Sequence, residues 1–122
     1  MTLKPHEMPA EVAELFKAGA VIPAHPLALD SSRQLDRRRQ RALTRYYVDA
    51  GAGGLAVGVH TTQFAIRDNG MFVPVLQAAI EDARGWTDRP LVMIAGVAGP
   101  IDQALEEART ARELGYHAAL VS

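Results

Sequence analysis

The chain has 122 residues, of which 48% are hydrophobic and 22% charged, and its formal net charge at pH 7 is -1. This composition is that of an ordinary globular domain, and the near-neutral charge argues against nucleic acid or an anionic membrane as a partner. The sequence has no cysteine, which excludes disulfides and thiolate metal sites. It has no run of about 18 apolar residues and no apolar signal-peptide core near its start, so we expect a cytoplasmic protein without membrane association.

The first part of the chain predicts a short helix followed by a short strand. Residues 1–20 form a leader, and residues 11–18 within it have the apolar spacing of an amphipathic helix. Residues 21–25 are an apolar run that predicts the first strand. Pro23 and Pro26 cannot donate to a ladder, so we expect its regular part to end near residue 25.

Three further apolar runs alternate with three amphipathic helices, and the apolar runs recur about 30 residues apart, the length of one strand–helix unit. Asp36 is a good candidate for the N-cap of the first of these helices. The predicted strands are residues 54–59, 91–95 and 118–122, and the predicted helices are residues 37–50, 72–83 and 100–114.

Long helical connections between apolar strands force parallel pairing, so the predicted fold class is α/β. A half-barrel and an open doubly wound sheet both satisfy this pattern, and we favour the barrel because polar and glycine residues gather after the strands. A closed (β/α)8 barrel needs roughly 250 residues. We therefore predict that residues 21–122 are the N-terminal half of a (β/α)8 TIM barrel, with about four parallel strands and a short leading helix.

The carboxyl ends of the predicted strands carry the candidate chemistry. The polar and glycine residues there are His25, His60, Thr61, Thr62, Gln63, Gly96, Gly99 and Ser122. Thr61 and Thr62 offer two hydroxyls and two backbone N–H groups, a set that suits the carboxylate of a small acid better than a metal. The alternative is that both threonines only satisfy backbone groups of their own loop.

His25 and His60 follow neighbouring strands and are the only candidates for a metal pair. A working site needs a third ligand, and neither histidine has a carboxylate beside it. We therefore predict no metal site and keep a metal-assisted hydrolase only as a lesser hypothesis.

Two other motifs are weak evidence for ligand binding. Residues 51–56 match the dinucleotide pattern G-x-G-x-x-A, but they lie between a helix and a strand, the reverse of the order that places phosphates on a helix N-terminus. Six arginines between residues 33 and 45 have no stacking aromatic residue among them, so a solvated helix face or a subunit contact is favoured over nucleic-acid binding.

Several segments have an informative order and spacing, namely Asp36, Ala50-Gly51, Gly54-Leu55, Val57, Thr61-Thr62, residues 92–97 and residues 111–121. Together they resemble the dihydrodipicolinate synthase/N-acetylneuraminate lyase family. The resemblance implies a (β/α)8 barrel in a homo-oligomer. It also implies aldol addition or cleavage of a 2-oxo acid such as pyruvate, through a lysine Schiff base and without a cofactor.

The resemblance matches Thr61 and Thr62 to the threonines that bind the oxo-acid carboxylate in the family. His60 and Gln63 stand where the family has flanking glycines. The family's catalytic tyrosine and Schiff-base lysine come after the fourth strand and on the sixth, and the only lysines here, Lys4 and Lys17, precede the first strand.

We therefore predict part of a class I aldolase or lyase, with no catalytic residue within these 122 residues and no lyase activity from them alone. Substrate-binding residues would be Thr61, Thr62, His60, His25 and Gly96. The alternative is a self-associating half-barrel that acts as a binding or assembly module without catalysis.

Overall fold

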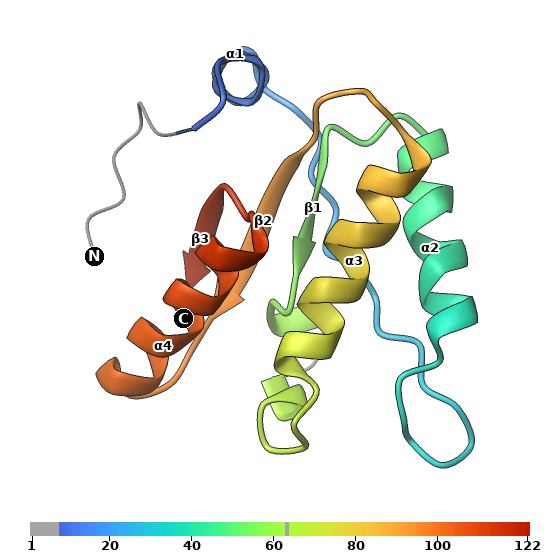
Figure 1. The fold of residues 1–122 in the computed structure, drawn as a ribbon, viewed down its shortest axis with the longest axis vertical. Coiled ribbons are helices and arrows are strands. Elements are labelled where there is room, and N and C mark those ends of the chain that lie inside the picture. The colour runs from blue at the N-terminus through green and yellow to red at the C-terminus, as the bar shows by residue number, and fades with distance from the viewer. Residues whose placement is uncertain (1–7, 63) are drawn as a thin grey trace.

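The computed structural model describes residues 8–62 and 64–122, and its centre is a parallel sheet with strand order β1-β2-β3 (Figure 1). The strands are β1 (Gly54–Val57), β2 (Val92–Val97) and β3 (Ala118–Val121). Gly54 pairs with Val92 at the start of the β1–β2 ladder. A helix joins each strand to the next, as a parallel connection requires. The predicted α/β class is confirmed.

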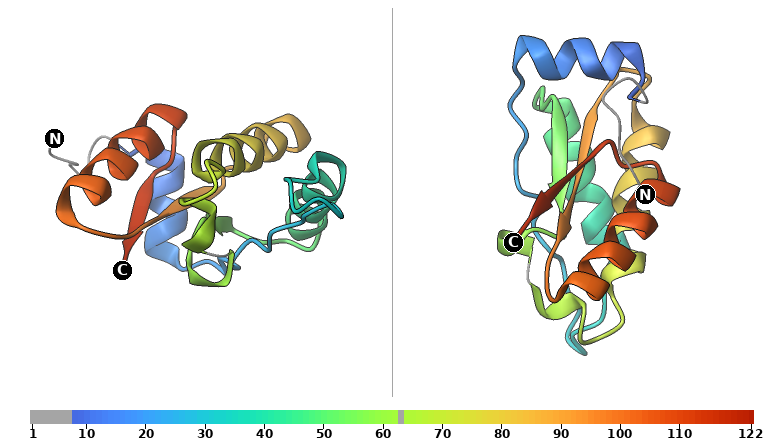
Figure 2. Two further views of the ribbon diagram at one scale, coloured as in Figure 1. Left: turned by 90° about the horizontal axis from the view of Figure 1, so that it is seen from below. Right: turned by 90° about the vertical axis from the view of Figure 1, so that its left-hand side faces the viewer.

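The helices are α1 (Ala10–Ala18), α2 (Arg37–Asp49), α3 (Phe72–Trp86) and α4 (Ile101–Leu114), and two short 3-10 helices, η2 (His60–Thr62) and η3 (Phe64–Ile66), follow β1. α2, α3 and α4 form an arc on one side of the sheet, and α1 lies across the amino ends of the strands (Figure 2). A parallel sheet with its crossover helices on one side is the arrangement of part of a (β/α) barrel.

Residues 21–25 lie beside β1 without forming a regular strand. They make one parallel bridge, between Ala24 and Ala56, and the His25 N–H donates to the Ala56 carbonyl (2.8 Å). The Ala56 N–H in turn donates to the Pro23 carbonyl (2.9 Å). The two prolines of this segment have no N–H to extend the ladder. The sheet thus has three regular strands and one extended neighbour, where the sequence predicted about four strands.

The core lies between the sheet and helices α2 and α3. Every residue of β1 is buried, as expected for a parallel strand covered on both faces. Tyr116 closes the core near α3, where its hydroxyl donates to the Leu76 carbonyl (2.7 Å) and burial raises its pKa. The largest cluster of buried residues is Val48, Leu55, Val57, Ile66, Phe72, Val75, Leu76, Ala79, Ile80, Ala83, Leu91, Met93, Ala95, Ala111 and Tyr116.

Some element boundaries differ from those predicted. The strand predicted over residues 54–59 ends at Val57, because Gly58 takes a positive φ of 71° and turns the chain into η2. A residue with a side chain would be strained there. α3 runs on to Trp86, beyond the predicted end at residue 83. The predicted N-cap of α2 is confirmed, since the Asp36 carboxylate accepts from the Arg39 N–H (3.0 Å).

β3 is the exposed edge strand of the sheet. Leu120 and Val121 are 55% and 72% exposed, although β1 and β2 are almost wholly buried. Within residues 8–62 and 64–122, no helix combines the length and the apolar character needed to cross a membrane.

Candidate functional site

The carboxyl ends of β1 and β2 meet through their backbones. A Cβ built on Gly96 would lie 2.2 Å from the Gly58 carbonyl oxygen and 2.8 Å from the Val59 nitrogen. Only a residue without a side chain allows this approach. Gly96, predicted at the site from the sequence, thus lies against the turn that leads from β1 into η2, and its place there is set by backbone packing.

η2 presents predicted site residues at this end of the sheet. His60 and Thr61 are both exposed, and the His60 ring packs edge-on against Phe64 with 5.1 Å between ring centroids. Thr62 is the last residue of η2. Gln63 lies outside the described residues. The hydroxyl-bearing loop is therefore where the sequence placed it, directly after a buried parallel strand.

A buried guanidinium lies beneath this loop. Arg67 donates from Nη2 to the carbonyl oxygens of Gly58 (3.2 Å) and Gly96 (3.0 Å). Gly58 directly follows β1, and Gly96 lies in β2. Its carbon Cζ lies 5.3 Å from the centre of the Phe64 ring and 4.8 Å from that of Phe72. The Arg67 side chain is 9% exposed, so the charge is almost wholly removed from water.

Glu107 on α4 neutralises this charge. Its two carboxylate oxygens accept from Arg67 Nε at 2.9 and 3.1 Å, and the Glu107 side chain is 8% exposed. The same carboxylate accepts from the Ala98 N–H (3.1 Å) and from Gln103 Nε2 (2.9 Å). We call Arg67 and Glu107 the buried ion pair. Sequence reasoning missed it, although one signal was present: Glu107 lies four residues before the buried Ala111, on the apolar face of α4.

His25 lies elsewhere, in a polar cluster under α2. His25 Nδ1 lies 2.7 Å from the Gln40 amide nitrogen and 3.1 Å from the Pro26 carbonyl oxygen, and His25 Nε2 lies 2.8 Å from the Thr44 hydroxyl oxygen. His25, Gln40 and Thr44 are each 0% exposed. Burial lowers the His25 pKa, so the ring is held neutral. Both ring nitrogens thus lie within hydrogen-bonding distance of groups inside the fold, and the role of His25 in substrate binding stays a prediction.

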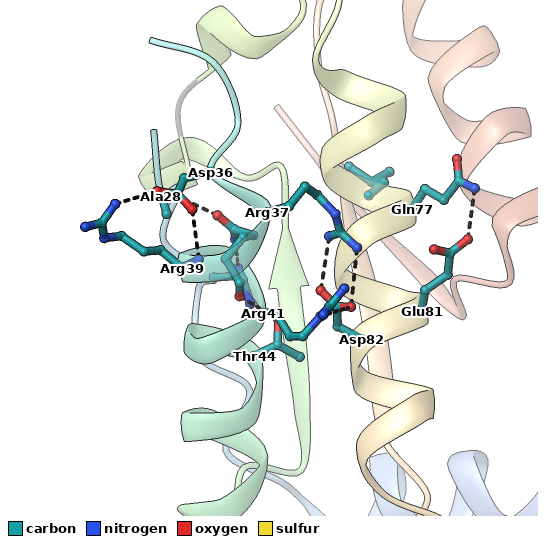
Figure 3. A network of polar contacts seen from close by, with 12 residues as sticks. Ala28, Asp36, Arg37, Arg39, Arg41, Thr44, Gln77, Glu81 and Asp82 are labelled. Carbon is teal, nitrogen blue, oxygen red and sulfur yellow. Dashed lines mark hydrogen bonds and ion pairs between the residues drawn. The ribbon is translucent and has the colours of Figure 1, made fainter. Parts of the chain in front are cut away.

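The arginine-rich helix is tied to its neighbours by ion pairs. Figure 3 shows Arg37 and Arg41 reaching from α2 to the carboxylate of Asp82 on α3, with N···O distances of 3.1 and 3.2 Å. Arg39 turns back to Asp36 at the start of the same helix, and its hydrogen bonds lower the Asp36 pKa. These arginines join helices of the fold, which explains part of the basic run without an external partner.

Two further observations concern other ligand sites. Within residues 8–62 and 64–122, no three His, Cys, Asp or Glu residues come together as a metal site would require. A hollow of about 320 Å³ lies at the opposite, amino end of the strands and includes Glu11, Arg84, Arg89 and His117 in its lining. His117 Nδ1 accepts there from the Met93 N–H (3.0 Å), and burial lowers the His117 pKa.

The comparisons with known proteins bear on the fold. No protein-family model matches the chain, and no curated protein is significantly similar to it in sequence. Dihydrodipicolinate synthase from Aquifex aeolicus superposes with a TM-score of 0.73 at 23% identity, over 84% of this chain and 33% of its own. YagE, a prophage protein of the dihydrodipicolinic acid synthase family from E. coli K12 solved with pyruvate, gives 0.73 at 22% identity over 83% and 33%. CdNal from Clostridium difficile, solved with mannosamine, gives 0.69 at 20% identity over 84% and 34%.

This protein thus has the fold of part of a dihydrodipicolinate synthase-type protein, and it spans about a third of the length of the solved structures that it matches. At these identities the likeness is one of fold. The resemblance seen in the sequence is confirmed at that level.

Proposed function

We propose that this chain is the substrate-carboxylate-binding portion of a class I aldolase or lyase that acts on a 2-oxo acid such as pyruvate. The observation that carries the proposal is the exposure of His60 and Thr61 on η2, at the carboxyl end of a parallel α/β sheet. In (β/α) barrels the chemistry lies at this end of the strands.

In this proposal, Thr61 and Thr62 provide the donors for the substrate carboxylate. A hydroxyl and a backbone N–H from each residue give charge-assisted hydrogen bonds, which are stronger than neutral ones. His60 lies beside them as a third donor to the same anion. Gly96 contributes by allowing β2 to lie against the turn that precedes this loop. No cofactor takes part, and the protein works as a cytoplasmic homo-oligomer.

The covalent step needs an amine, and among the described residues no lysine lies at the carboxyl end of the strands. Lys17 lies in the last turn of α1, and α1 crosses the amino ends of the strands (Figure 2). Imine formation requires a lysine whose amine is neutral in part and points at the substrate carbonyl. We propose that this lysine and the catalytic tyrosine belong to further polypeptide, and that residues 1–122 alone are inactive.

Borohydride trapping tests the proposal. The complete gene product and the 122-residue chain are each incubated with pyruvate and sodium borohydride, and their intact masses are measured. We expect one pyruvyl adduct on the complete product and none on the 122-residue chain. If the complete product forms no adduct, or if it has no lysine on a later strand, the aldolase proposal is wrong.

The open edge of β3 favours a second candidate, a half-barrel that associates with another copy of itself. Leu120 and Val121 are 55% and 72% exposed beside an edge that, among the described residues, has no partner strand. Such an edge readily pairs with another chain. Sedimentation of the 122-residue chain tests this candidate, and a monodisperse monomer of 13.2 kDa would contradict it.

A further inference from the structure

The buried ion pair joins two strands, but its burial carries a large desolvation free-energy cost. Removing a guanidinium and a carboxylate from water costs several kcal/mol per ion before their attraction offsets it. Arg67 Nη1 adds to the cost, because it is buried and has no hydrogen-bond partner among the described residues. Stability alone is therefore a poor explanation for this pair, and its geometry points to a positioning role.

We infer that Arg67 is a positioning residue, which sets the orientation of the loop that carries His60, Thr61 and Thr62. Arg67 Nη2 donates to the Gly58 carbonyl at 3.2 Å. The peptide unit is planar, so a fixed Gly58 carbonyl also fixes the direction of the Val59 N–H. That peptide is the entry to η2, which begins at the next residue.

The second strand is fixed by the same nitrogen. Arg67 Nη2 also donates to the Gly96 carbonyl at 3.0 Å, so one guanidinium group spans the carboxyl ends of β1 and β2. A lysine ammonium is a compact point charge on a flexible stem and lacks the rigid fork that holds several acceptors in fixed directions. The bridge therefore depends on arginine.

Glu107 holds the guanidinium in this orientation. It accepts from Arg67 Nε with both oxygens and from the Ala98 N–H, so α4 and the residue after β2 are fixed to the same group. The faces of Phe64 and Phe72 limit its tilt. These contacts restrict the movement of Arg67, and its bond to the Gly58 carbonyl reaches the turn before the loop.

This role deepens the proposed function and rests on it for its link to the substrate. His60 and Gln63 stand where the resembling family has glycines, whose flexibility lets a backbone approach an anion closely. The bond from Arg67 to the Gly58 carbonyl restricts the peptide that precedes this loop, and we expect it to limit the movement of the Thr61 N–H. Donors that are already ordered lose little conformational entropy when they bind an anion.

The test compares a variant without the buried ion pair with a control variant that lacks an exposed Arg–Glu pair on α4. Arg67→Met with Glu107→Gln removes both charges and keeps an oxygen acceptor for the Ala98 N–H. The control is Arg109→Gln with Glu106→Gln, which removes an Arg–Glu pair whose side chains are 57% and 74% exposed. Backbone ¹⁵N order parameters of His60 and Thr61 report loop order, and pyruvate is titrated against the Thr61 amide shift.

We expect the order parameters of His60 and Thr61 to fall from about 0.85 to below about 0.6 in the double variant, while α3 amides and the control variant keep wild-type values. We also expect the Kd for pyruvate to rise at least about tenfold. Unchanged order parameters at His60 and Thr61 would overturn the inference, whatever the result with pyruvate. If the order falls but the wild-type protein binds no pyruvate, the positioning role stands and the proposed function fails.

A second variant covers the case in which the double variant does not fold. Arg67→Lys keeps the positive charge beside Glu107 and loses the bridge between the two carbonyls. We expect it to fold, with intermediate order at His60 and Thr61. Wild-type order in Arg67→Lys would also overturn the inference, because charge alone would then be sufficient.

Discussion

Gly96→Ala is the substitution that tests the contact between β1 and β2 most directly. The new methyl group would lie 2.2 Å from the oxygen and 2.5 Å from the carbon of the Gly58 carbonyl. Both are backbone atoms, and Arg67 holds that carbonyl in place. The steric clash can be relieved only if the two strands separate at their carboxyl ends, because the nearest atoms belong to the backbone.

The expected cost is about 2–4 kcal/mol of unfolding free energy. Overpacking a well-filled site costs about 1–3 kcal/mol. Separating the strands also weakens the hydrogen bonds from Arg67 to the two carbonyls, and such charge-assisted bonds contribute about 1.5–3 kcal/mol each. Against a total stability of about 5–15 kcal/mol for a domain, this is a large fraction.

Urea denaturation followed by circular dichroism measures this change, with Gly85→Ala as the control. A Cβ on Gly85 would have nothing within 4 Å. Gly85 lies inside α3, so alanine there should stabilise the protein by about 0.5–1 kcal/mol. If the free energy of unfolding of Gly96→Ala lies within about 0.5 kcal/mol of the wild-type value, the close contact between β1 and β2 is refuted.

Other predictions concern the polar cluster and the ion pairs. Thr44→Val removes the buried hydroxyl that lies 2.8 Å from His25 Nε2, and we expect urea denaturation to show a loss of about 1–3 kcal/mol. Burial lowers the pKa of His25, and of His117, below the ordinary 6.5, so the unfolded chain binds the proton more readily. Stability measured by urea should therefore be full above about pH 6.5 and decline as the pH falls through the folded-state pKa values. Asp82→Asn removes the negative charge that pairs with two arginines, which are 42% and 48% exposed, and a loss of about 1–2 kcal/mol is expected in thermal unfolding.

Each of these predictions has a control. Thr110→Val alters a threonine on α4, outside the polar cluster under α2, and a loss equal to that of Thr44→Val would contradict the cluster. His25→Gln should reduce the decline in unfolding free energy at acidic pH. An unchanged pH dependence would mean that other groups cause the decline. Glu106→Gln removes a carboxylate that is 74% exposed, so it should leave stability nearly unchanged.

The strands and helices could largely be predicted because their signals are local. The apolar run of β1, the helical spacing of α3 and the two prolines near residue 25 each act within a few residues of themselves. The position of Thr61 after β1 follows from the same pattern, since the carboxyl end of a strand precedes its loop. Such features depend on hydrophobic periodicity and backbone chemistry, which a single sequence records.

The pairings of buried polar groups could not be predicted, because they join distant parts of the chain. Arg67 and Glu107 meet only after α4 packs against the ends of the strands. Likewise, His25 looked like a site residue because it follows a strand, and only the packing of α2 brings Gln40 and Thr44 to its ring. No local pattern distinguishes a buried polar side chain that has a partner from one that faces a ligand.

The all-parallel sheet also determines how quickly the protein can fold. In this parallel ladder, Gly54 pairs with Val92 across the whole of α3, and Ile94 pairs with Ala118 across the whole of α4. Forming contacts between residues so far apart in sequence costs loop-closure entropy before the contacts stabilise the fold. We expect α3 and α4 to order early and the three strands to join late, on the millisecond-to-second scale typical of non-local pairing.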